Sequence, residues 1–490
     1  MLSRVRRAPR GLLVLVVLAF AHALAWVAVQ PPLTGADEHL HTAYVQSIAE
    51  TGDGPKYSEG NGALSTELGT LHQRLYLQAI VLHPEARPAW GLEDRVDELL
   101  QELPDDARKN TTGPNTAAAN PFLYYSVAAV AWKLSPDRSL PGRILTVRTL
   151  TALLLPVTVV LAWLIAAELF AAAWLRPVVA GIVAFNPKLA NLAGIVNPDM
   201  LLATLGTGCL LAALRLVQRG FTVKRLLALS LTAGGGALTH PRGLYLPVFA
   251  VVVVALTLWL RRDDARVWWR EQRTRGALLR GGGAFTLLFV LVAVAYLWTR
   301  SHVGSGTVSG NTPVGAGLNP RELLSYLWQF YFPGFDIFTS PVGQGYGYQQ
   351  VFIGTFFGAF GSLDVHFQQE TYSRLQIGAF LGLVALYTAA VVRFPALRRR
   401  WPVVAVCVLA VVGLVGEMHL VSYTQLRIGG NPVITGRYLA PAIVLMAAAM
   451  AFVASSLPRR FGRLVGGAFV GLALVHGVGA LGVALERYFA

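Results

Sequence analysis

GLLVLVVLAFAHALAWVAVQ, residues 11–30, is an apolar run, and the polar stretch PPLTGADEHLH at 31–41 follows it directly. Roughly 17 to 25 apolar residues in a helix cross a bilayer core about 30 Å thick, so this run predicts a membrane span. The whole chain agrees, because 54% of its 490 residues are hydrophobic and 14% are charged, whereas soluble domains average about 25% charged residues. The sequence therefore predicts an all-α polytopic membrane protein and excludes a soluble fold.

About eleven apolar segments along the chain are long enough to be spans, within a range of about 10 to 13. They are 11–30, 148–168, 174–192, 200–217, 225–240, 243–260, 281–299, 376–392, 402–422, 438–456 and 464–486. The apolar stretch 120–134 is only about 15 residues long, so it is expected to lie in the interface or to re-enter. Cys209 and Cys407 both fall inside expected spans, and no disulfide is expected.

Basic residues indicate the side of the membrane on which each loop lies, because short cytoplasmic loops are rich in Lys and Arg. Five basic clusters occur, at 4–10, 215–225, 261–280, 393–400 and 459–463. One alternation of spans places all five, and the N-terminus, in the cytoplasm. The same alternation places 31–147, with juxtamembrane helices, and 300–375 outside. We expect these two large, ordered loops to belong to one membrane domain that covers 1–490, in the plasma membrane.

The net charge of +15 lies mainly in the basic loops. It therefore indicates positive-inside retention and attraction to anionic membrane lipid, and no nucleic-acid partner is expected. The apolar run 11–30 has an alternative interpretation as a secretory signal, because the small residues at 21–25 resemble a cleavage site. The length of the run favours a retained anchor.

Asp37 and Glu38 are the first candidates for chemistry. Thr34 is placed to cap a helix whose first turn carries both acids, and the helix dipole favours their ionised form. His41 follows Asp37 by four residues and shares its face of that helix. A carboxylate kept charged at a membrane surface can act as a general base. The alternative is that both acids are ordinary first-turn residues.

The other candidates are polar side chains at the expected outer ends of spans. They are Asp199, His240, Arg242, Arg427, Arg437 and Tyr438. Arginine suits a lipid phosphate because its planar guanidinium donates two parallel hydrogen bonds. The alternatives are a helix cap at Asp199 and interfacial anchoring for the arginines and the tyrosine.

The segment 352–364 is rich in aromatic residues and glycine. Close helix packing or lipid contact is its favoured role, and lining a groove for an isoprenoid tail is the alternative. The sequence contains no Walker A loop, GxGxxG, HExxH or zinc-spaced Cys/His cluster. Chemistry that needs ATP or a bound cytosolic cofactor is therefore unsupported, and a membrane lipid is the better candidate donor.

These residues resemble the GT-C superfamily of polytopic glycosyltransferases that use polyprenyl-phosphate sugars. The resemblance rests on Asp37-Glu38, on NPFLYY at 120–125, which is similar to a PPLYY element, and on NPD at 197–199. Within the superfamily, the chain is most like a bacterial family of poorly characterised membrane proteins. That likeness rests on the order of DEHLH at 37–41, FFGAFGSLD at 356–364 and GRY at 436–438.

The resemblance implies a GT-C-like fold and an inverting transfer from a polyprenyl-phosphate sugar to an envelope glycan, lipid or protein on the extracytoplasmic face. It implies Asp37 as the catalytic base, with Glu38 or Asp199 orienting the acceptor or a divalent metal. Metal dependence varies within the superfamily, so a requirement for Mg²⁺ or Mn²⁺ is left open, with these three carboxylates as candidate ligands.

The substrate-binding residues that the resemblance implies are His41, Tyr124, Tyr125, Asp199, His240, Arg242, Arg427, Arg437 and Tyr438, with Arg242 and Arg437 on the carrier phosphate. Two positions depart from the pattern. Asn120 replaces the first proline of the aromatic element, and Arg242 stands where many relatives have lysine. Arginine keeps its charge, so phosphate binding survives this change while a proton-transfer role does not.

Two other classes of protein are alternatives. A flippase or other transporter of lipid-linked sugars needs polar groups near the bilayer midplane, where this chain has mainly Glu417 and His419. A non-catalytic envelope-assembly subunit would use the outer loops to bind a partner, and it would tolerate loss of Asp37 and Glu38 together.

Overall fold

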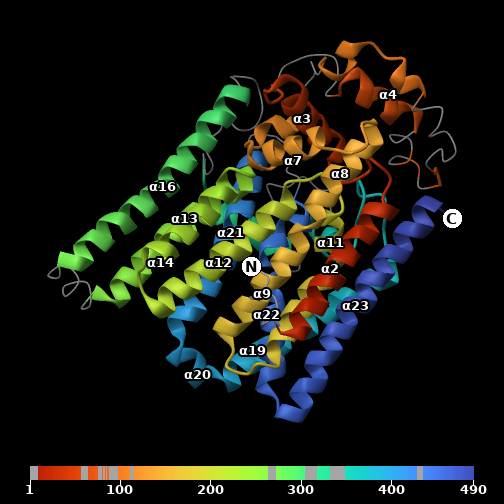
Figure 1. The fold of residues 1–490 in the computed structure, drawn as a ribbon. Helices are drawn as coiled ribbons and strands as arrows, with labels where there is room; N and C mark the ends of the chain where they lie inside the picture. The colour runs from red at the N-terminus through yellow and green to blue at the C-terminus, as the bar shows by residue number, and fades with distance from the viewer. Residues whose placement is uncertain are drawn as a thin grey trace.

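The structure is a computed structural model whose described part is a bundle of helices (Figure 1). It describes residues 9–56, 64–75, 80, 83, 85–87, 98–110, 115–262, 272–303, 317–331, 348–427 and 434–489. Most of the basic cluster at 4–10, residues 263–271 of the cluster at 261–280, and parts of the two predicted outer loops lie outside these ranges. Within them, the only β pairing is one isolated bridge between Phe360 and Val365. The predicted all-α class is confirmed.

Nine helices in the described ranges are long and apolar enough to cross a membrane. Five are single helices: α2 (Arg10–Val29), α12 (Asp199–Arg219), α19 (Gln369–Val392), α21 (Trp401–Arg427) and α23 (Arg459–Phe489). Three are pairs of consecutive helices: α8 (Leu140–Ala152) with α9 (Leu154–Leu169), η3 (Pro241–Leu244) with α14 (Tyr245–Leu260), and η5 (Gly436–Ala442) with α22 (Ile443–Ser456). The ninth is Leu279–Val303, which is part of α16 (Gln272–Val303). Each coincides with one of the predicted segments, so the chain is a multi-pass membrane protein.

The other two predicted segments form shorter helices. The segment 174–192 divides into α10 (Leu175–Ala184) and α11 (Pro187–Ala193). The side chain of Asn186 caps α11 by accepting from the backbone N–H of Leu189, and Pro187 has no N–H with which to continue α10. The segment 225–240 forms the 15-residue α13 (Val223–Ala237), which is about 22 Å long.

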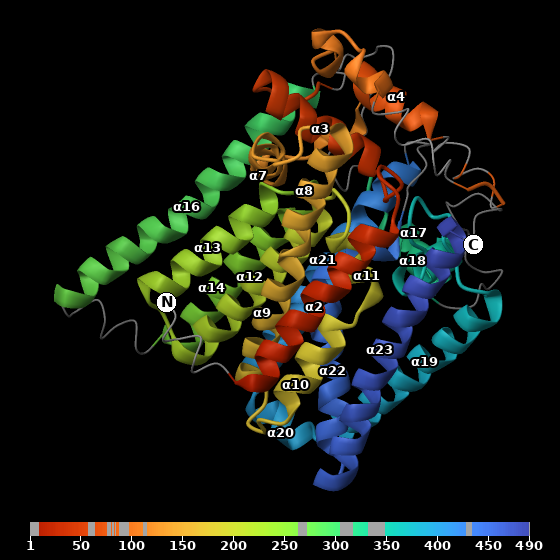
Figure 2. The ribbon, with the colours of Figure 1, turned by 45° about the vertical axis from the view of Figure 1, so that its right-hand side comes forward.

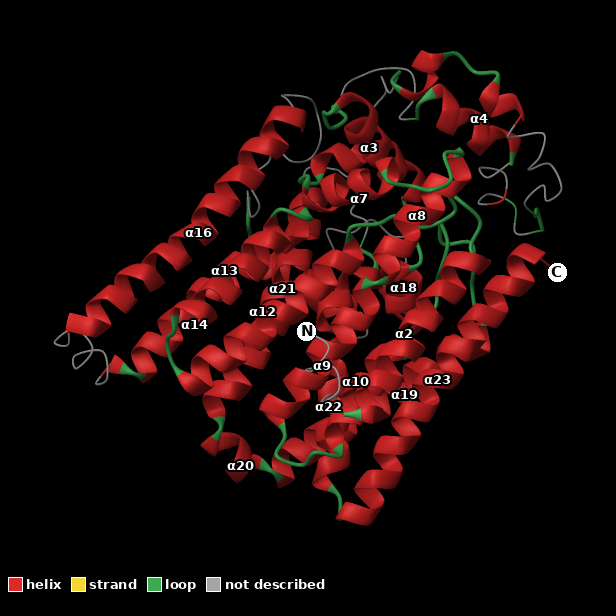
Figure 3. Ribbon diagram, in the orientation of Figure 1, coloured by secondary structure: helices red, strands yellow, loops and turns green. Residues whose placement is uncertain are grey.

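Short helices gather at one end of the bundle, whereas α20 (Phe394–Arg399) lies at the opposite end (Figures 1 and 2). The short helices are α3 (Glu38–Thr51), α4 (Thr66–Arg74), η1 (Asp105–Arg108), η2 (Thr116–Ala119) and α7 (Leu123–Lys133), with α17 (Pro320–Tyr331) and α18 (Tyr348–Phe357) following later in the chain. Helix α7 has 11 residues and so extends about 16 Å, which agrees with the prediction that 120–134 does not cross. Loops join the helices mainly at these two ends (Figure 3).

Helix α12 is the central helix of the bundle. Of its apolar window 78% is buried, compared with 6% for the peripheral α19. It packs against α9, α13, α14, α21 and η5. Its 21 residues run from Asp199 to Arg219, a length of about 30 Å. The first residue of α12 lies at the end that carries the short helices, because Asn197, just before α12, donates to the carbonyl of Ala36 next to α3. The last residue of α12 lies at the opposite end.

Candidate active site

The chain enters α3 through two residues in the left-handed region, Leu33 (φ 65°) and Asp37 (φ 55°). This conformation costs non-glycine residues about 1 to 3 kcal/mol and persists where the surroundings impose it. The predicted capping role of Thr34 is wrong, because its hydroxyl donates to the carbonyl of Pro31 at 2.8 Å. Asp37 takes the N-cap position without a side-chain capping bond. Its carboxylate is therefore available to groups outside α3.

Glu38 is fully buried and paired with Arg148 of α8. One carboxylate oxygen accepts from Arg148 Nε at 2.7 Å and from the backbone N–H of Val196 at 2.9 Å. The other accepts from Arg148 Nη2 at 2.6 Å and from the backbone N–H of Gly35 at 3.0 Å. Four hydrogen bonds occupy the acceptor sites of this carboxylate. The geometry favours a structural role for Glu38 over the predicted catalytic one.

Asp37, Asp199 and Arg437 meet at the end of the bundle that carries the short helices. Arg437 Nη2 donates to Asp37 Oδ2, and Arg437 Nε lies 3.6 Å from Asp199 Oδ2. The side chain of Asp199 is 6% exposed, whereas that of Asp37 is 48% exposed. The guanidinium thus joins two carboxylates that are far apart in sequence, and only the Asp37 carboxylate is widely open to solvent.

Two arginines share one aromatic ring beside these carboxylates. The guanidinium carbon of Arg242 lies 3.6 Å from the ring centroid of Tyr438, and that of Arg437 lies 5.1 Å from it. Among the described residues, the buried Arg242 Nη1 and Arg437 Nε have no hydrogen-bond partner. Buried donors are almost always satisfied in folded proteins. Arg437 Nε faces the Asp199 carboxylate, so the unpaired N–H of Arg242, beside a second cation, is the group that indicates a place for an anion.

The histidines of the site are uncharged at neutral pH. Burial lowers the pKa of His41 to about 4 and that of His240 to about 3. His240 Nδ1 accepts from the backbone N–H of Arg242 at 3.1 Å, so the neutral ring carries its proton on Nε2, 3.8 Å from Asp199 Oδ1. Burial acts to raise the pKa of Asp37, but opposing influences, of which Arg437 is the largest, bring this pKa below its ordinary value. Asp37 is therefore ionised at neutral pH.

Tyr124, Tyr125 and His41 form a buried layer behind the site. The Tyr125 hydroxyl accepts from Asn120 Nδ2 and bonds to His41 Nδ1, both at 2.8 Å. The Tyr124 hydroxyl accepts from the backbone N–H of Asn197 at 3.0 Å. The tyrosines are 3% and 0% exposed. We therefore interpret these three predicted substrate-binding residues as supports for the 36–41 and 197–199 segments.

The aromatic and glycine-rich segment 352–364 braces the site from two sides. The hydroxyl of Thr355 accepts from the backbone N–H of Gly436 at 2.6 Å, next to Arg437. The hydroxyl of Ser362 donates to the carbonyl of Thr34 at 3.2 Å, three residues before Asp37. This arrangement matches the packing role that the sequence favoured for the segment.

Two cationic residues of this region, Arg148 and Lys188, were not among the predicted site residues. Arg148 lies in a segment predicted as a span, and its partner Glu38 is 110 residues away. Lys188 of α11 is 4% exposed, donates to the carbonyl of Ala359 and lies 4.5 Å from the ring centroid of Phe360. A buried lysine inside an apolar run is a signal that could have identified it, because such a charge is costly without a role.

Arg427, another predicted site residue, forms its ion pair away from this cluster. Its Nη1 donates to Glu322 of α17 at 2.6 Å, and its side chain is 39% exposed. Arg427 is thereby engaged with α17, and the Asp37, Asp199 and Arg437 cluster does not include it.

The predicted candidate metal ligands do not form a metal site among the described residues, where no group of three His, Cys, Asp or Glu side chains could hold an ion. The carboxylate of Glu38 is occupied by Arg148. Asp37 and Asp199 both face Arg437, whose guanidinium stands where a bridging cation would bind. The donor set therefore does not fit the divalent ion that the sequence left open.

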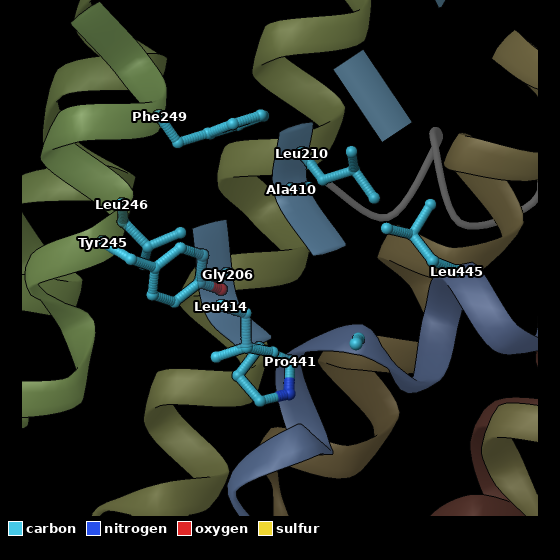
Figure 4. Close-up of a pocket in the computed structure, with 10 residues that line it drawn as sticks. Gly206, Leu210, Tyr245, Leu246, Phe249, Ala410, Leu414, Pro441 and Leu445 are labelled. Carbon is cyan, nitrogen blue, oxygen red and sulfur yellow. The ribbon is translucent and has the colours of Figure 1, made fainter. Parts of the chain in front are cut away.

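An apolar pocket lies within the helix bundle (Figure 4). Its lining comes from α12, α14, α21 and the η5 to α22 region, and it consists of Gly206, Leu210, Tyr245, Leu246, Phe249, Ala410, Leu414, Pro441, Ala442 and Leu445. Tyr245 follows Arg242 by three residues, and Pro441 follows Tyr438 by three residues. A cationic site and an apolar pocket that share η5 suit an amphipathic ligand.

The structure is similar to the oligosaccharyltransferase of Archaeoglobus fulgidus in the apo form, at 12% identity and a TM-score of 0.48, over 97% of this chain and 56% of that chain. It is also similar to ArnT from Cupriavidus metallidurans in the apo state, at 17% identity and a TM-score of 0.34, over 93% of this chain and 77% of that chain. The chain thus spans little more than half the length of the archaeal protein. No curated protein matches the sequence.

The family described as predicted membrane protein (DUF2142) matches residues 20–446, a range that includes Asp37, Asp199, Arg242 and Arg437. Because this match covers most of the 490 residues, the chain belongs to the DUF2142 family of membrane proteins.

Proposed function

We propose that the protein is an inverting glycosyltransferase that moves a sugar from a polyprenyl-phosphate donor to a hydroxyl group of an envelope glycan, lipid or protein. One observation carries this proposal. A solvent-accessible carboxylate, Asp37, pairs with Arg437, which shares the ring of Tyr438 with Arg242, and a buried N–H of Arg242 has no partner in the described part of the chain. Residues that follow Arg242 and Tyr438 in the chain line an apolar pocket. The motifs that carry the resemblance to the GT-C superfamily contain Asp37 and Arg437, whereas Arg242 lies outside them.

The arginines and the pocket together suit a lipid phosphate. Guanidinium groups recognise phosphate oxygens through parallel charge-assisted hydrogen bonds. The side chains that line the pocket between α12, α14 and α21 are hydrocarbon or aromatic, which suits an isoprenoid unit next to the phosphate. They must move apart to admit that unit, because the free space between them is about 10 Å³. We therefore assign the donor phosphate to Arg242 and Arg437.

In the proposed reaction, Asp37 accepts the proton of the acceptor hydroxyl. The acceptor oxygen forms a bond to the anomeric carbon from the face opposite the phosphate, and the bond from that carbon to the phosphate oxygen breaks. The electron pair leaves with the polyprenyl phosphate, whose additional charge Arg242 and Arg437 stabilise. A positioned base contributes about 10²- to 10⁴-fold to such a step.

The ion pair between Asp37 and Arg437 gives the donor a second role. Without donor, Arg437 holds the pKa of Asp37 below its ordinary value, which makes this carboxylate a weak base. A phosphate that takes hydrogen bonds from Arg437 competes with Asp37 for the guanidinium. Donor binding would then raise the basicity of Asp37 at the moment when an acceptor proton must be removed.

The test uses the full chain in lipid nanodiscs with a panel of radiolabelled polyprenyl-phosphate sugars and envelope acceptors. We compare the wild type with D37N and with D106N, which removes an exposed carboxylate of η1. Transfer by the wild type and D106N, but not by D37N, supports the proposal. Substantial transfer by D37N would remove the base assignment. Tight donor binding by all three proteins without turnover would favour the transporter or assembly-subunit alternatives.

A further inference from the structure

A cluster of arginines surrounds Glu168 at the end of the bundle opposite Asp37. Glu168 is the last residue but one of α9, and its side chain is 7% exposed. It accepts from Arg215 Nε at 2.9 Å and from Arg219 Nη2 at 2.7 Å. Both arginines lie in the last two turns of α12. Two cations thus already satisfy the only acid of this cluster among the described residues.

Three more arginines enter the cluster and bond to backbone carbonyls. Arg225 Nη1 donates to the carbonyls of Arg219 and Gly220, both at 2.7 Å. Arg400 Nη2 donates to the carbonyl of Glu168 at 2.9 Å, and Arg261 Nη2 donates to that of Gln218 at 3.1 Å. Carbonyl oxygens satisfy N–H groups but neutralise no charge. Within the described residues, five guanidinium groups therefore gather around one carboxylate, which leaves a positive excess there.

Gln218 gives an independent sign that an acceptor belongs in this cluster. Its backbone oxygen accepts from Arg261, and its side-chain oxygen accepts from Arg400 at 3.5 Å. Its side-chain Nε2 is buried and has no hydrogen-bond partner in the described part of the chain. A buried amide donor among cations needs an anionic or neutral oxygen, and an anion would also offset the positive excess.

Two tryptophans place the cluster at the level of lipid headgroups. Trp259 and Trp401 form an edge-to-face pair with ring centroids 5.8 Å apart. They remain 57% and 41% exposed, and they stand two residues before Arg261 and one residue after Arg400. Exposed tryptophans at the ends of spans mark the boundary between hydrocarbon and headgroups. A ligand that reaches this place from the bilayer brings a headgroup to the arginines.

We infer that Arg215, Arg219, Arg225, Arg261 and Arg400, with the amide of Gln218, bind the phosphate of an anionic phospholipid headgroup. The acyl chains of that lipid would lie along the apolar helices near Trp259 and Trp401. Basic pockets between spans hold anionic headgroups through this combination of guanidinium groups and interfacial anchors. The site is independent of the proposed transferase chemistry at the other end of the bundle.

The experiment measures lipid binding to the full chain with phosphatidylglycerol as the probe. Nanodiscs of phosphatidylcholine receive increasing fractions of phosphatidylglycerol, and native mass spectrometry and the apparent Tm report binding. The test variant R225Q/R400Q removes two guanidinium groups that do not bond to the carboxylate of Glu168. The control R459Q/R460Q removes the same charge from exposed positions at the start of α23. A third arm adds inorganic phosphate to pure phosphatidylcholine discs.

Wild type and control are expected to retain phosphatidylglycerol in preference to phosphatidylcholine and to gain apparent Tm from it. R225Q/R400Q should bind phosphatidylglycerol about 30-fold more weakly, at about 1 kcal/mol per arginine, with an apparent Tm in pure phosphatidylcholine close to that of the control. Equal phosphatidylglycerol binding by the test variant and the control would overturn the proposal. Stabilisation by inorganic phosphate without a preference for phosphatidylglycerol would assign the cluster to free phosphate and overturn the lipid assignment.

Discussion

Asp37 and Glu38 are neighbours in sequence, yet their side chains meet different surroundings. Because the backbone at Asp37 is left-handed, the two side chains point in different directions. The Glu38 carboxylate enters the protein and meets Arg148, whereas the Asp37 carboxylate stays 48% exposed beside Arg437. At the scale of single residues, the structure therefore divides the acid pair into one group that holds the fold and one that is open to a substrate.

Replacing Glu38 by glutamine should destabilise the protein. The change leaves the buried Arg148 without its carboxylate, and breaking one half of a buried ion pair costs about 3 to 5 kcal/mol. The apparent Tm in nanodiscs measures this loss. The control E370Q removes an exposed partner of Arg374, which is worth less than about 0.5 kcal/mol. An unchanged Tm for E38Q together with lost transfer would instead return Glu38 to the catalytic machinery.

Replacing Arg437 by glutamine should move the acidic limb of the pH profile. Without the guanidinium, the influence of burial is no longer outweighed, so the pKa of Asp37 rises. Asp37 then loses its proton-accepting form at higher pH, and kcat/KM falls off earlier as the pH is lowered. His41 and His240, with pKa values of about 4 and 3, do not titrate near neutral pH and so do not change kcat/KM there.

The measurement is kcat/KM against pH, normalised to its maximum for each protein. R374Q is the control, because Arg374 is exposed and pairs within α19; its profile should match that of the wild type. An R437Q profile whose acidic limb stays at the wild-type position would show that Arg437 does not set the pKa of Asp37.

At the scale of elements, α18 and the turn after it connect two parts of the site that are about 400 residues apart in sequence. Thr355 holds the backbone at Gly436, and Ser362 holds the carbonyl of Thr34. The turn is tight, with Gly361 at φ 62° and Leu363 at φ 70°. The distance between Asp37 and Arg437 therefore depends on the conformation of this turn.

Replacing Gly361 by alanine should impair transfer without unfolding the bundle. An added Cβ would overlap Asp364 Oδ1 and lie 2.6 Å from the Tyr488 hydroxyl, and φ is positive at this position, so the turn must shift. Misplacement of catalytic groups by about 1 Å can cost about 10²-fold in rate. The matched control is G378A in α19, where an added Cβ meets nothing within 4 Å. Equal kcat for G361A and G378A would contradict the bracing role.

The spans were predictable because each is a long apolar run, and the five basic clusters alternate with them. The division of 174–192 into two helices was harder to predict. Asn186-Pro187 is compatible with a helix cap and also with a kink that a membrane span tolerates. Lys188 follows directly and was overlooked within that apolar run. Length and hydropathy thus predict which segments cross, while local capping decides where a span is broken.

The site was predictable as a set of polar residues at one end of the spans, but its pairings were not. Arg437 joins Asp37 and Asp199 across hundreds of residues, and no local pattern specifies such a contact. Arg427, like Arg437, was predicted to bind substrate at the outer end of a span, yet it pairs with Glu322 of α17. The choice between these two arginines depends on tertiary packing, which periodicity and motif order do not contain.

At the scale of the whole molecule, the bundle presents two chemically different ends. The Asp37 site lies with the short helices at the N-terminal end of α12, and the arginine cluster lies at its C-terminal end, about 30 Å away along the helix. A helix of this length crosses the hydrocarbon core once. The two sites therefore belong to opposite faces of a membrane, and the positive-inside rule predicts that the arginine cluster faces the cytoplasm.

Single cysteines at the two ends test this arrangement. Replacing Cys209 and Cys407 by alanine removes the only thiols of the chain, and D106C or R460C then adds one at an exposed position of η1 or at the start of α23. A membrane-impermeant maleimide applied to sealed right-side-out vesicles should label D106C and spare R460C until detergent opens the membrane. Each variant is its own control, because full labelling in detergent shows that the thiol is reactive. Labelling of both from outside would contradict the span assignment, and the reversed pattern would place the Asp37 site in the cytoplasm, where an extracytoplasmic acceptor could not reach it.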